Sequence, residues 1–322
     1  MKPSTISKNM KRPIHPTVNR EPDNLSNYDL TNYLNDKKEL INSKLDKIFR
    51  NFASSSHIVK AMEYSLMAGG KRIRPILCLA ATKAVGGNLD SALPAACAIE
   101  MIHTYSLIHD DLPAMDDDEL RRAKPTCHVA FDESTAILAG DALLTLAFQI
   151  LSSSVKIKES EALIWLNVIQ VISIAAGYKG MIDGQMKDII SEGKSLSLDD
   201  LENMHALKTG ALIEASIFSG AILGNGSQEQ IKQLRIYAKN LGLAFQVTDD
   251  ILNVEGNPAV MGKAVGTDKN RKKSTYPLIM GLNESKKFAT NIINNALKAI
   301  ELFDNKADPL RAVARYILKR KK

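Results

Sequence analysis

Apolar residues recur at helical spacing along nearly the whole chain from Asn27 onward, and no segment alternates as a half-buried strand would. Two of the helical segments end at glycine pairs, Gly69-Gly70 and Gly86-Gly87, which are typical C-terminal signals. Hydrophobic residues make up 45% of the 322 residues, which is enough for a substantial core. The sequence therefore predicts an all-α fold, organised as one large domain or two small ones.

The net charge of +6 comes from the two ends of the chain. The first twenty residues carry five Lys and Arg and no acid, and residues 319–322 add four more, so the part between them is slightly acidic. Residues 1–26 are polar, rich in Pro and Asn and without periodicity, which predicts a disordered tail. Aromatic residues make up only 5% of the chain, and no basic face with stacking aromatics is apparent. We therefore expect no nucleic-acid binding.

Three cysteines, Cys78, Cys97 and Cys127, lie without metal-ligand spacing and are expected to be reduced, which favours a cytoplasmic location. The N-terminal region lacks the apolar stretch of a signal peptide, and prolines interrupt any targeting helix in the basic leader. The longest uncharged run, Ala162–Tyr178, is broken by polar residues. It predicts a buried core helix and no membrane insertion.

The stretch Ile99–Arg122 is an apolar helical run that ends in a cluster of carboxylates and two arginines. His103 and Asp110 share one helical face. Pro113 cannot continue the helix, so the chain should bulge there and bring Asp116 back toward Asp110. Converging carboxylates beside arginines favour Mg²⁺ bound against a phosphorylated substrate. The alternative is a solvated acidic loop between two helices.

A second acidic cluster follows another apolar run. Four polar residues lie at i, i+3, i+4 and i+7 on one side of a helix: Gln246, Asp249, Asp250 and Asn253. Like charges placed this way repel each other unless a cation neutralises them. Together, the two clusters predict a metal clamp with two sides.

Basic segments also interrupt the apolar pattern. The loop Gly69–Pro75 combines two glycines, which allow close backbone approach, with three cations in four residues. A diphosphate would explain this charge between apolar helices, and the alternative is a solvent-facing basic loop. Lys208-Thr209-Gly210 interrupts a later helix, where we expect a kink or close packing. Gln185 and Asp188 are placed on one helical face.

These motifs, in this order, resemble the trans-isoprenyl diphosphate synthases and are most similar to the bacterial farnesyl diphosphate synthases among them. The resemblance spans Asn27–Lys322. The motifs that carry it are GGKRIRP, IHTYSLIHDDLPAMDDDELRR, KPTCH, LAGDAL, DGQMKD, KTGALI, FQVTDDILN and KKSTYP. The resemblance implies one catalytic domain over residues 27–322, built as an all-α helix bundle around a central catalytic cavity. It also implies a homodimer.

The resemblance further implies the residues of the site. Asp110 and Asp116 on one wall, and Asp249 on the other, would bind three Mg²⁺ ions, with Asp111 and Asp250 as supporting acids. Contacts to isopentenyl diphosphate fall on Lys71, Arg74, His103 and Arg122. Contacts to the allylic diphosphate fall on Arg121, Lys208, Lys263 and Lys273. Thr209 and Gln246 would line the place where positive charge develops.

The implied activity is that of a Mg²⁺-dependent prenyltransferase. It would condense isopentenyl diphosphate head to tail with dimethylallyl and geranyl diphosphate and give (2E,6E)-farnesyl diphosphate. The alternatives are a geranylgeranyl or geranyl diphosphate synthase, a class I terpene cyclase and a non-catalytic synthase subunit. Tyr105 and Ser106, which precede Asp110, are expected to set product length, with the Tyr105 ring as the floor of the chain cavity. Asn253 replaces the third acid usual in this family, and we expect it to weaken metal binding.

Overall fold

The computed structural model describes residues 28–52, 56–153, 159–255 and 273–320. The predicted disordered tail, residues 1–26, and the predicted site residue Lys263 lie outside the described residues. The α-helices, in chain order, are α1 (Leu30–Phe49), α2 (His57–Leu66), α3 (Ile73–Ala84), α4 (Leu89–Asp110), α5 (Cys127–Ala130), α6 (Glu133–Ser153), α7 (Glu159–Ala176), α8 (Met181–Ser191), α9 (Leu198–His205), α10 (Ala211–Leu223), α11 (Gln228–Glu255), α14 (Tyr276–Met280), α15 (Leu282–Ala299) and α16 (Asp308–Lys319). The other regular elements are the strands β1 (Leu120–Arg121) and β2 (Lys124–Pro125), a π-helical turn (Ala206–Gly210) and a 3-10 turn (Asn305–Ala307).

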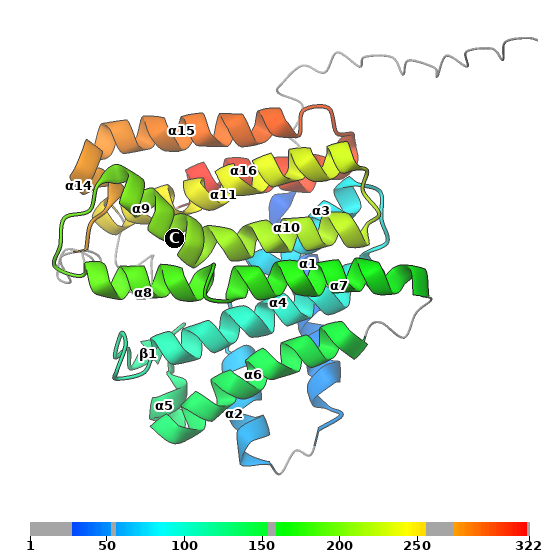
Figure 1. Ribbon diagram of the computed structural model, residues 1–322, viewed down its shortest axis with the longest axis vertical. Helices are drawn as coiled ribbons and strands as arrows, with labels where there is room; N and C mark the ends of the chain where they lie inside the picture. Colours follow the sequence, from blue (N-terminus) through cyan, green and yellow to red (C-terminus); the bar gives the residue numbers. More distant parts are fainter. Residues whose placement is uncertain (1–27, 53–55, 154–158, 256–272, 321–322) are drawn as a thin grey trace, which may run out of the picture.

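The prediction of an all-α helix bundle is confirmed. In Figure 1 the long helices lie in rows, with α15 beside α11, followed by α10, α4 and α6, and each of these neighbours is in contact. The two strands pair antiparallel, with Leu120 opposite Pro125 and Arg121 opposite Lys124. They were not predicted because two residues are too few to show an alternating pattern.

The helix α4 lies inside the bundle. Apolar residues occupy all of its sides, and it contacts α3, α6 and α10. A helix that is hydrophobic all round is typical of a buried position. The Asn88 side chain caps its first turn by accepting a hydrogen bond from the Asp90 N–H. The last residue of this well-packed helix is Asp110, so the core itself positions the first acidic cluster.

The helix α7 differs from the prediction for Ala162–Tyr178. Its side chains Leu163, Leu166 and Ile174 are 74%, 57% and 51% exposed. The prediction of a buried core helix is therefore wrong. Only one side of α7 faces the bundle, and periodicity could not reveal this because both sides of the helix are apolar.

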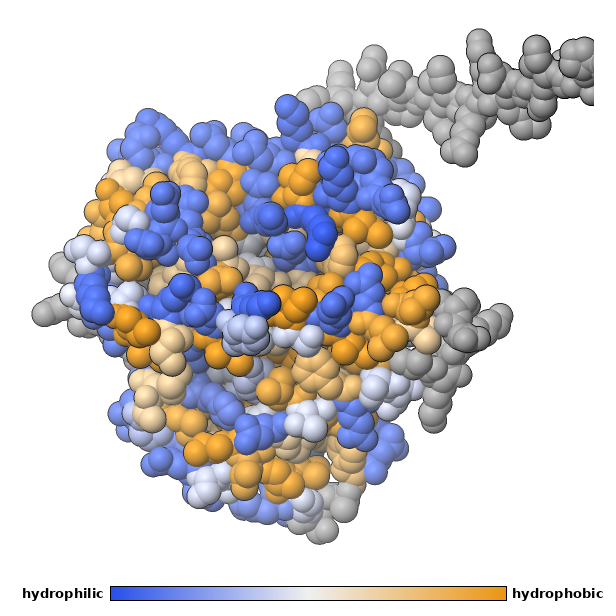
Figure 2. Space-filling model, viewed as in Figure 1, coloured by the Kyte–Doolittle hydropathy of each residue, from blue (hydrophilic) through white to orange (hydrophobic). Residues whose placement is uncertain are grey.

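Three helical stretches are long and apolar enough to cross a membrane by length and composition: Glu133–Ser153, Glu161–Ser191 and Leu198–Leu223. All three belong to the bundle and contact α4 through α6, α7 and α10. Exposed apolar side chains gather along α7 and α8 on the face shown in Figure 2. We name this surface the apolar band; its residues are Leu163, Leu166, Ile174, Ile182, Met186 and Ile190.

Candidate active site

The first acidic cluster begins where α4 ends. Asp110 is the last residue of the helix, and Asp111 is its C-cap. The chain turns back after Pro113, so that the Asp116 N–H donates to the Asp110 carbonyl oxygen over 2.8 Å. The predicted bulge is therefore confirmed, and it brings Asp110 and Asp116 to the same end of α4.

The Asp110 carboxyl has a pKa raised to about 6. Burial is the main cause, the Lys208 ammonium opposes it, and the Asp116 carboxylate raises the pKa further. A bound cation would favour the ionised form that burial disfavours. Asp110 and Asp116 are therefore the best-placed candidate metal ligands of this wall.

Asp111 has a different environment. Its side chain is 4% exposed, and its two oxygens accept hydrogen bonds from Arg121 Nε at 2.7 and 2.8 Å, with Arg121 Nη2 completing the pair. Asp118 lies 3.5 Å from the same guanidinium. Asp111 thus orients Arg121 through a fork-like ion pair. Its direct role toward a metal ion stays a prediction.

The second acidic cluster lies on α11, and all four of its residues fall within the helix as predicted. Asp249 Oδ1 accepts a hydrogen bond from Arg320 Nη2 at 3.0 Å. Asp250 Oδ2 accepts one from the Tyr276 N–H at 3.0 Å, at the start of α14. Asn253 is buried, with 7% exposure. Both carboxylates of this wall therefore have partners within the chain.

Two lysines, Lys208 and Lys273, lie near the first acidic cluster. Lys208 is close enough to Asp110 to lower its pKa. On the other side, burial lowers the pKa of His205 to about 4, and Asp249, Lys208 and Lys273 all lie near enough to His205 to affect it. The first acidic cluster therefore lies close to both ammonium groups, and His205 lies near both these lysines and Asp249 of the second cluster. That the two clusters form a clamp with two sides stays a prediction.

Asp188, on α8, holds the two lysines together. Its Oδ2 accepts hydrogen bonds from Lys208 Nζ at 2.6 Å and from Lys273 Nζ at 2.8 Å. Burial acts to raise the pKa of Asp188, but the two ammonium groups outweigh burial and hold the pKa below its ordinary value. The sequence placed Asp188 on a face with Gln185 but gave it no partner, because the lysines are 20 and 85 residues away.

Lys208 lies in a π-helical turn, Ala206–Gly210, which confirms the predicted irregularity at this point. Such turns are frequent at functional sites. A Cβ at Gly184 would lie 2.1 Å from the Lys208 amide nitrogen, so only glycine lets α8 approach the turn this closely. Thr209, the next residue, is 8% exposed, and Gln246 on α11 is half-buried.

The three cationic side chains of the GGKRIRP loop have different environments. Arg72 has φ 53 and points inward, where its Nη1 lies 2.7 Å from Glu100 and the residue is 2% exposed. Lys71 is exposed. Arg74, on the first turn of α3, has its Nη1 3.3 Å from His103 Nε2. Arg72 is therefore the anchor of the loop, and the predicted substrate contacts rest on Lys71 and Arg74.

His103 is surrounded by arginines. Burial lowers its pKa well below the ordinary value, and Arg74, Arg122, Arg121 and Arg72 lower it further. The imidazole is therefore neutral at physiological pH. The buried Arg74 Nε finds no hydrogen-bond acceptor among the described residues. An orphaned donor within so much positive charge fits an anionic ligand such as a diphosphate.

Arg122 joins this group from the β1–β2 hairpin. Its Nη1 donates to the Gly69 carbonyl oxygen. A Cβ at Gly70, where φ is +110, would lie 2.5 Å from the Arg122 guanidinium carbon. The hairpin that follows the first acidic cluster is therefore packed directly on the GGKRIRP loop. The four residues implied for isopentenyl diphosphate come from that loop and its helix, from α4 and from the hairpin: Lys71, Arg74, His103 and Arg122.

The predicted chain-length residues lie on α4. The Tyr105 ring is buried and packs edge-on against His109, with 5.7 Å between ring centroids. Burial and the Asp110 carboxylate raise the pKa of Tyr105 to about 12, so the phenol lies near the first acidic cluster. The Ser106 hydroxyl donates to the His103 carbonyl oxygen at 2.9 Å, a contact within its own helix. The roles of Tyr105 and Ser106 in setting product length stay predictions.

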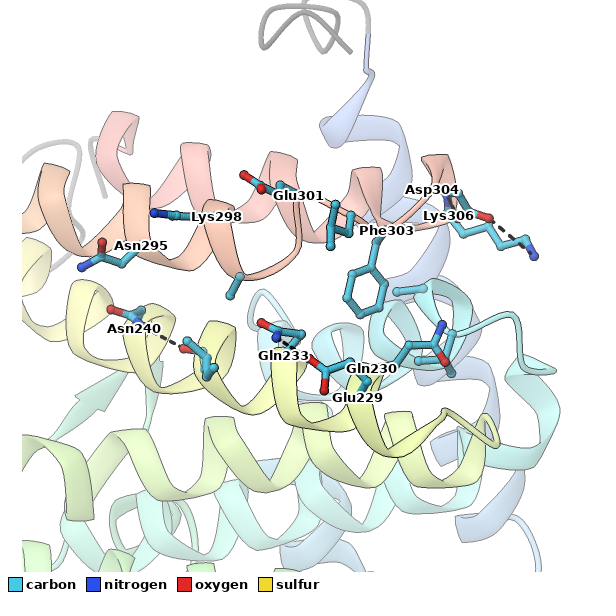
Figure 3. A pocket seen from close by; sticks show the side chains of 15 residues that line it. Glu229, Gln230, Gln233, Asn240, Asn295, Lys298, Glu301, Phe303, Asp304 and Lys306 are labelled. Carbon is cyan, nitrogen blue, oxygen red and sulfur yellow. Dashed lines mark hydrogen bonds and ion pairs between the residues drawn. The ribbon is translucent and has the colours of Figure 1, made fainter. Parts of the chain in front are cut away.

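One cavity in the described part of the chain lies away from these residues. It is a groove of about 1070 Å³ between α11 and α15, lined by residues such as Gln233, Asn295 and Phe303 (Figure 3). None of the predicted site residues lines it. A smaller cavity of about 30 Å³ lies beside Asp111 and Arg121.

The donor set fits Mg²⁺ bound together with a phosphorylated ligand. Within residues 28–52, 56–153, 159–255 and 273–320, no three His, Cys, Asp or Glu side chains gather closely enough to enclose an ion. Mg²⁺, however, is usually held by one or two carboxylates and by substrate phosphates rather than by an all-protein cage. Asp110 and Asp116, opposite two lysines, offer such a partial shell.

Comparison with known proteins gives a consistent result. Residues 55–311 match the family model described as polyprenyl synthetase. A geranylgeranyl diphosphate synthase from Cyanophora paradoxa is 44% identical over 296 residues, which cover 92% of this chain and 98% of the relative. A farnesyl diphosphate synthase from Micrococcus luteus is 47% identical over 283 residues, which cover 88% of this chain and 95% of the relative.

A solved structure, the geranylgeranyl pyrophosphate synthetase from Pyrococcus horikoshii, superposes with a TM-score of 0.82 at 31% identity and covers 91% of this chain and 98% of its own. The relatives carry both farnesyl and geranylgeranyl product names, and the matches run over nearly the full length of each. The resemblance inferred from the motifs is confirmed. The chain belongs to the polyprenyl synthetase family and is a prenyltransferase of the farnesyl and geranylgeranyl diphosphate synthase type.

Proposed function

We propose that this enzyme condenses isopentenyl diphosphate first with dimethylallyl diphosphate and then with geranyl diphosphate, and releases (2E,6E)-farnesyl diphosphate. The observation that carries the proposal is the arrangement of charge. Carboxylates at the end of α4 lie close to Lys208 and Lys273, Asp249 on α11 lies near His205, and a group of arginines surrounds His103. Two anion sites beside one set of candidate metal ligands suit a reaction between two diphosphates held in register.

The allylic diphosphate would bind between the two acidic clusters. Mg²⁺, three ions in this proposal, would neutralise the diphosphate as its C–O bond breaks. The ions would be held by Asp110, Asp116 and Asp249, with Asp111 and Asp250 as supporting acids. Lys208 and Lys273 would donate hydrogen bonds to the same diphosphate and stabilise the negative charge that it gains. Arg121 and Lys263 complete the proposed contacts.

Isopentenyl diphosphate would bind at the arginine group, to Lys71, Arg74, His103 and Arg122. A neutral His103 with a lowered pKa is a poor general base. Because its Nε2 accepts from Arg74 Nη1, its Nδ1–H is left to donate to the diphosphate. The proton lost after condensation therefore goes to the released diphosphate in this proposal. The Thr209 hydroxyl and the Gln246 amide oxygen would stabilise the carbocation without reacting with it.

Farnesyl rather than geranylgeranyl diphosphate is proposed because of Tyr105. This residue, whose ring is buried, lies five positions before Asp110, which is about 7.5 Å along the axis of α4 at 1.5 Å per residue. A chain that grows from the first acidic cluster along α4 would meet this ring. Geranylgeranyl diphosphate is the second candidate, and relatives with both product names support keeping it.

The apolar band supports a homodimer. Monomeric soluble proteins rarely expose large contiguous apolar surfaces, and two copies could cover their α7 and α8 helices by a two-fold contact. The three cysteines are free and buried, which supports a reducing compartment such as the cytoplasm.

One assay tests the proposal. Purified protein is incubated with Mg²⁺, isopentenyl diphosphate and dimethylallyl diphosphate, and the products are identified by chain length. Fifteen-carbon farnesyl diphosphate supports the proposal, whereas twenty-carbon or ten-carbon diphosphate favours a geranylgeranyl or geranyl synthase. Cyclic hydrocarbons would indicate a terpene cyclase, and no turnover without a second protein would indicate a non-catalytic subunit.

A further inference from the structure

Arg320 is tied to the second acidic cluster by three contacts. Its Nη2 donates to Asp249 Oδ1 at 3.0 Å and to the Phe245 carbonyl oxygen at 2.9 Å. Its guanidinium carbon lies 4.1 Å from the centre of the Phe245 ring, a cation–π contact. The Arg320 side chain is only 5% exposed. The arginine is therefore a fixed part of this wall.

This contact changes the charge of the second wall. Asp249 and Asp250 carry two negative charges, Asn253 carries none, and Arg320 adds one positive charge. Counted over these four described residues, the wall that the family resemblance offers to metal ions has a net charge of −1. Asp250 accepts a hydrogen bond from the first residue of α14, and Asp249 already forms an ion pair with Arg320.

A divalent cation bound to Asp249 Oδ1 would compete with this guanidinium for the oxygen, and one bound to Oδ2 would lie next to its positive charge. Mg²⁺ binds carboxylate oxygens at about 2.0–2.1 Å and repels a guanidinium nitrogen held on the same atom. Arg320 has extended backbone angles, φ −63 and ψ 146, just beyond the end of α16. Its side chain can leave Asp249 without unwinding that helix.

We propose that Arg320 is a positioning residue of the metal site: it holds Asp249 in the free chain, and a divalent cation that binds Asp249 displaces its guanidinium. The inference rests on the proposed function, because it assigns Asp249 to a metal ion. It adds to that function a role for Arg320, at the C-terminal end of α16, in setting the affinity for the metal ion.

The test measures metal affinity without turnover. Free Mn²⁺ is titrated by electron paramagnetic resonance against the full chain, with inorganic diphosphate present. Arg320→Met keeps an unbranched side chain over Phe245 and removes the charge. We expect it to tighten the apparent Kd for Mn²⁺ about three- to tenfold, because the competing ion pair is gone. Lys319→Gln, which removes a neighbouring exposed charge, should leave the Kd within twofold.

A double-mutant cycle isolates the contact. On an Asp249→Ala background, Arg320→Met should no longer change the Kd. If Asp249→Ala weakens Mn²⁺ binding but Arg320→Met leaves it unchanged or weakens it, the inference is overturned while the metal site stands. If Asp249→Ala has no effect, the metal role of Asp249 and the inference both fail. Should Arg320→Met not fold, Phe245→Leu loosens the guanidinium without removing charge and should still tighten binding, and an unchanged Kd would overturn the inference.

Discussion

The backbone N–H of Asp116 donates to the carbonyl oxygen of Asp110, and this 2.8 Å hydrogen bond closes the turn that follows α4. Carbonyl groups in the last turn of a helix lack intrahelical partners, so the returning chain satisfies one of them. The same bond fixes the distance between two acids that are six positions apart. The Asp116 carboxylate lies close enough to raise the pKa of Asp110. We therefore expect both carboxylates to act on one cation, and losing either should affect chemistry before it affects the fold.

The first prediction concerns Asp110. Asp110→Ala should lower kcat by about a thousandfold or more while leaving the fold intact, because it removes a candidate metal ligand and no core contact. Steady-state kinetics at saturating Mg²⁺ and circular dichroism measure the two effects. Glu119→Ala is the matched control, since this exposed acid lies nearby but outside the predicted metal shell, and it should stay near wild-type activity. Near-normal turnover of Asp110→Ala would contradict the assignment.

The second prediction uses the raised pKa of Asp110. The folded chain favours the protonated acid, because its pKa of about 6 lies above the ordinary 3.8. The stabilising contribution of this group is therefore complete below pH 3.8 and is lost as the pH rises through 6. In the absence of metal, Asp110→Asn should raise the free energy of unfolding at pH 8, by up to about 3 kcal/mol, and change it little at pH 4.

Thermal unfolding with EDTA at the two pH values checks this result. Ionisation also controls metal binding, because a proton and a cation compete for the carboxylate. The Mg²⁺ concentration for half-maximal rate should therefore rise as the pH falls below about 6. If the difference in free energy of unfolding between Asp110→Asn and wild type does not change with pH, burial does not raise the pKa of the Asp110 carboxyl.

The third prediction concerns Asn253. Asn253→Asp adds a carboxylate beside Asp249 and should lower the Mg²⁺ concentration for half-maximal rate. Asn240→Asp makes the same charge change on the same helix about 20 Å away, at 1.5 Å per residue, and should leave that concentration unchanged. An unaltered Mg²⁺ dependence in Asn253→Asp would place Asn253 outside the metal shell.

The fourth prediction concerns product length. Tyr105→Ala should release products of twenty carbons or more while sparing the first condensation, because it removes the ring proposed to close the chain cavity. Tyr105→Phe keeps the ring and its edge-on contact with His109, so it should still stop at fifteen carbons. Chromatography of the dephosphorylated products measures both. Fifteen-carbon product at normal rate from Tyr105→Ala would mean that another residue forms the floor.

The fifth prediction concerns Asp188. Asp188→Asn leaves Lys208 and Lys273 close together without their shared carboxylate, and should lower the free energy of unfolding at pH 7 by on the order of 3 kcal/mol. Because the pKa of Asp188 is lowered, its contribution is present above the ordinary pKa and is lost as the pH falls through the folded-state pKa. The difference from wild type should therefore shrink toward pH 3.

Asp183→Asn is the control for this variant. It lies on the same helix and removes an exposed ion pair with Lys187, so it should change the free energy of unfolding by less than about 1 kcal/mol. Chemical denaturation of both variants gives the comparison. Equal destabilisation by the two variants would show that the buried bridge is worth no more than a surface pair.

Local features of this protein were predictable because their causes are local. Periodicity predicted the helices, and Pro113 predicted the return of Asp116 to the end of α4. The two acidic clusters were visible as spacing patterns on single helices. Each inference needed only residues within about two turns of each other.

The remaining features depend on partners that are distant in sequence. The inward turn of Arg72 requires Glu100, 28 residues away, and the pairing of Asp188 requires lysines 20 and 85 residues away. Arg320 meets Asp249 from the far end of the chain. The exposure of α7 was misjudged because an apolar helix can cover a core or a surface with the same residues. Tertiary packing determines all of these contacts and exposures, and the spacing of residues along one helix carries no information about that packing.

The inward position of Arg72 has a consequence for how this sequence can diverge. The side chains of Lys71 and Arg72 have opposite environments, one exposed and one buried against Glu100, although they are adjacent. A single-residue insertion between Gly70 and Lys71 would place lysine against the buried acid and move the anchor away from it, and a deletion of Lys71 would bring Arg72 to the exposed position. Substitution of the exposed Lys71 leaves this anchor in place, but a gap beside it does not. In an alignment with any new relative, a gap within residues 69–75 would mark a protein whose equivalent of the GGKRIRP loop is held in a different way.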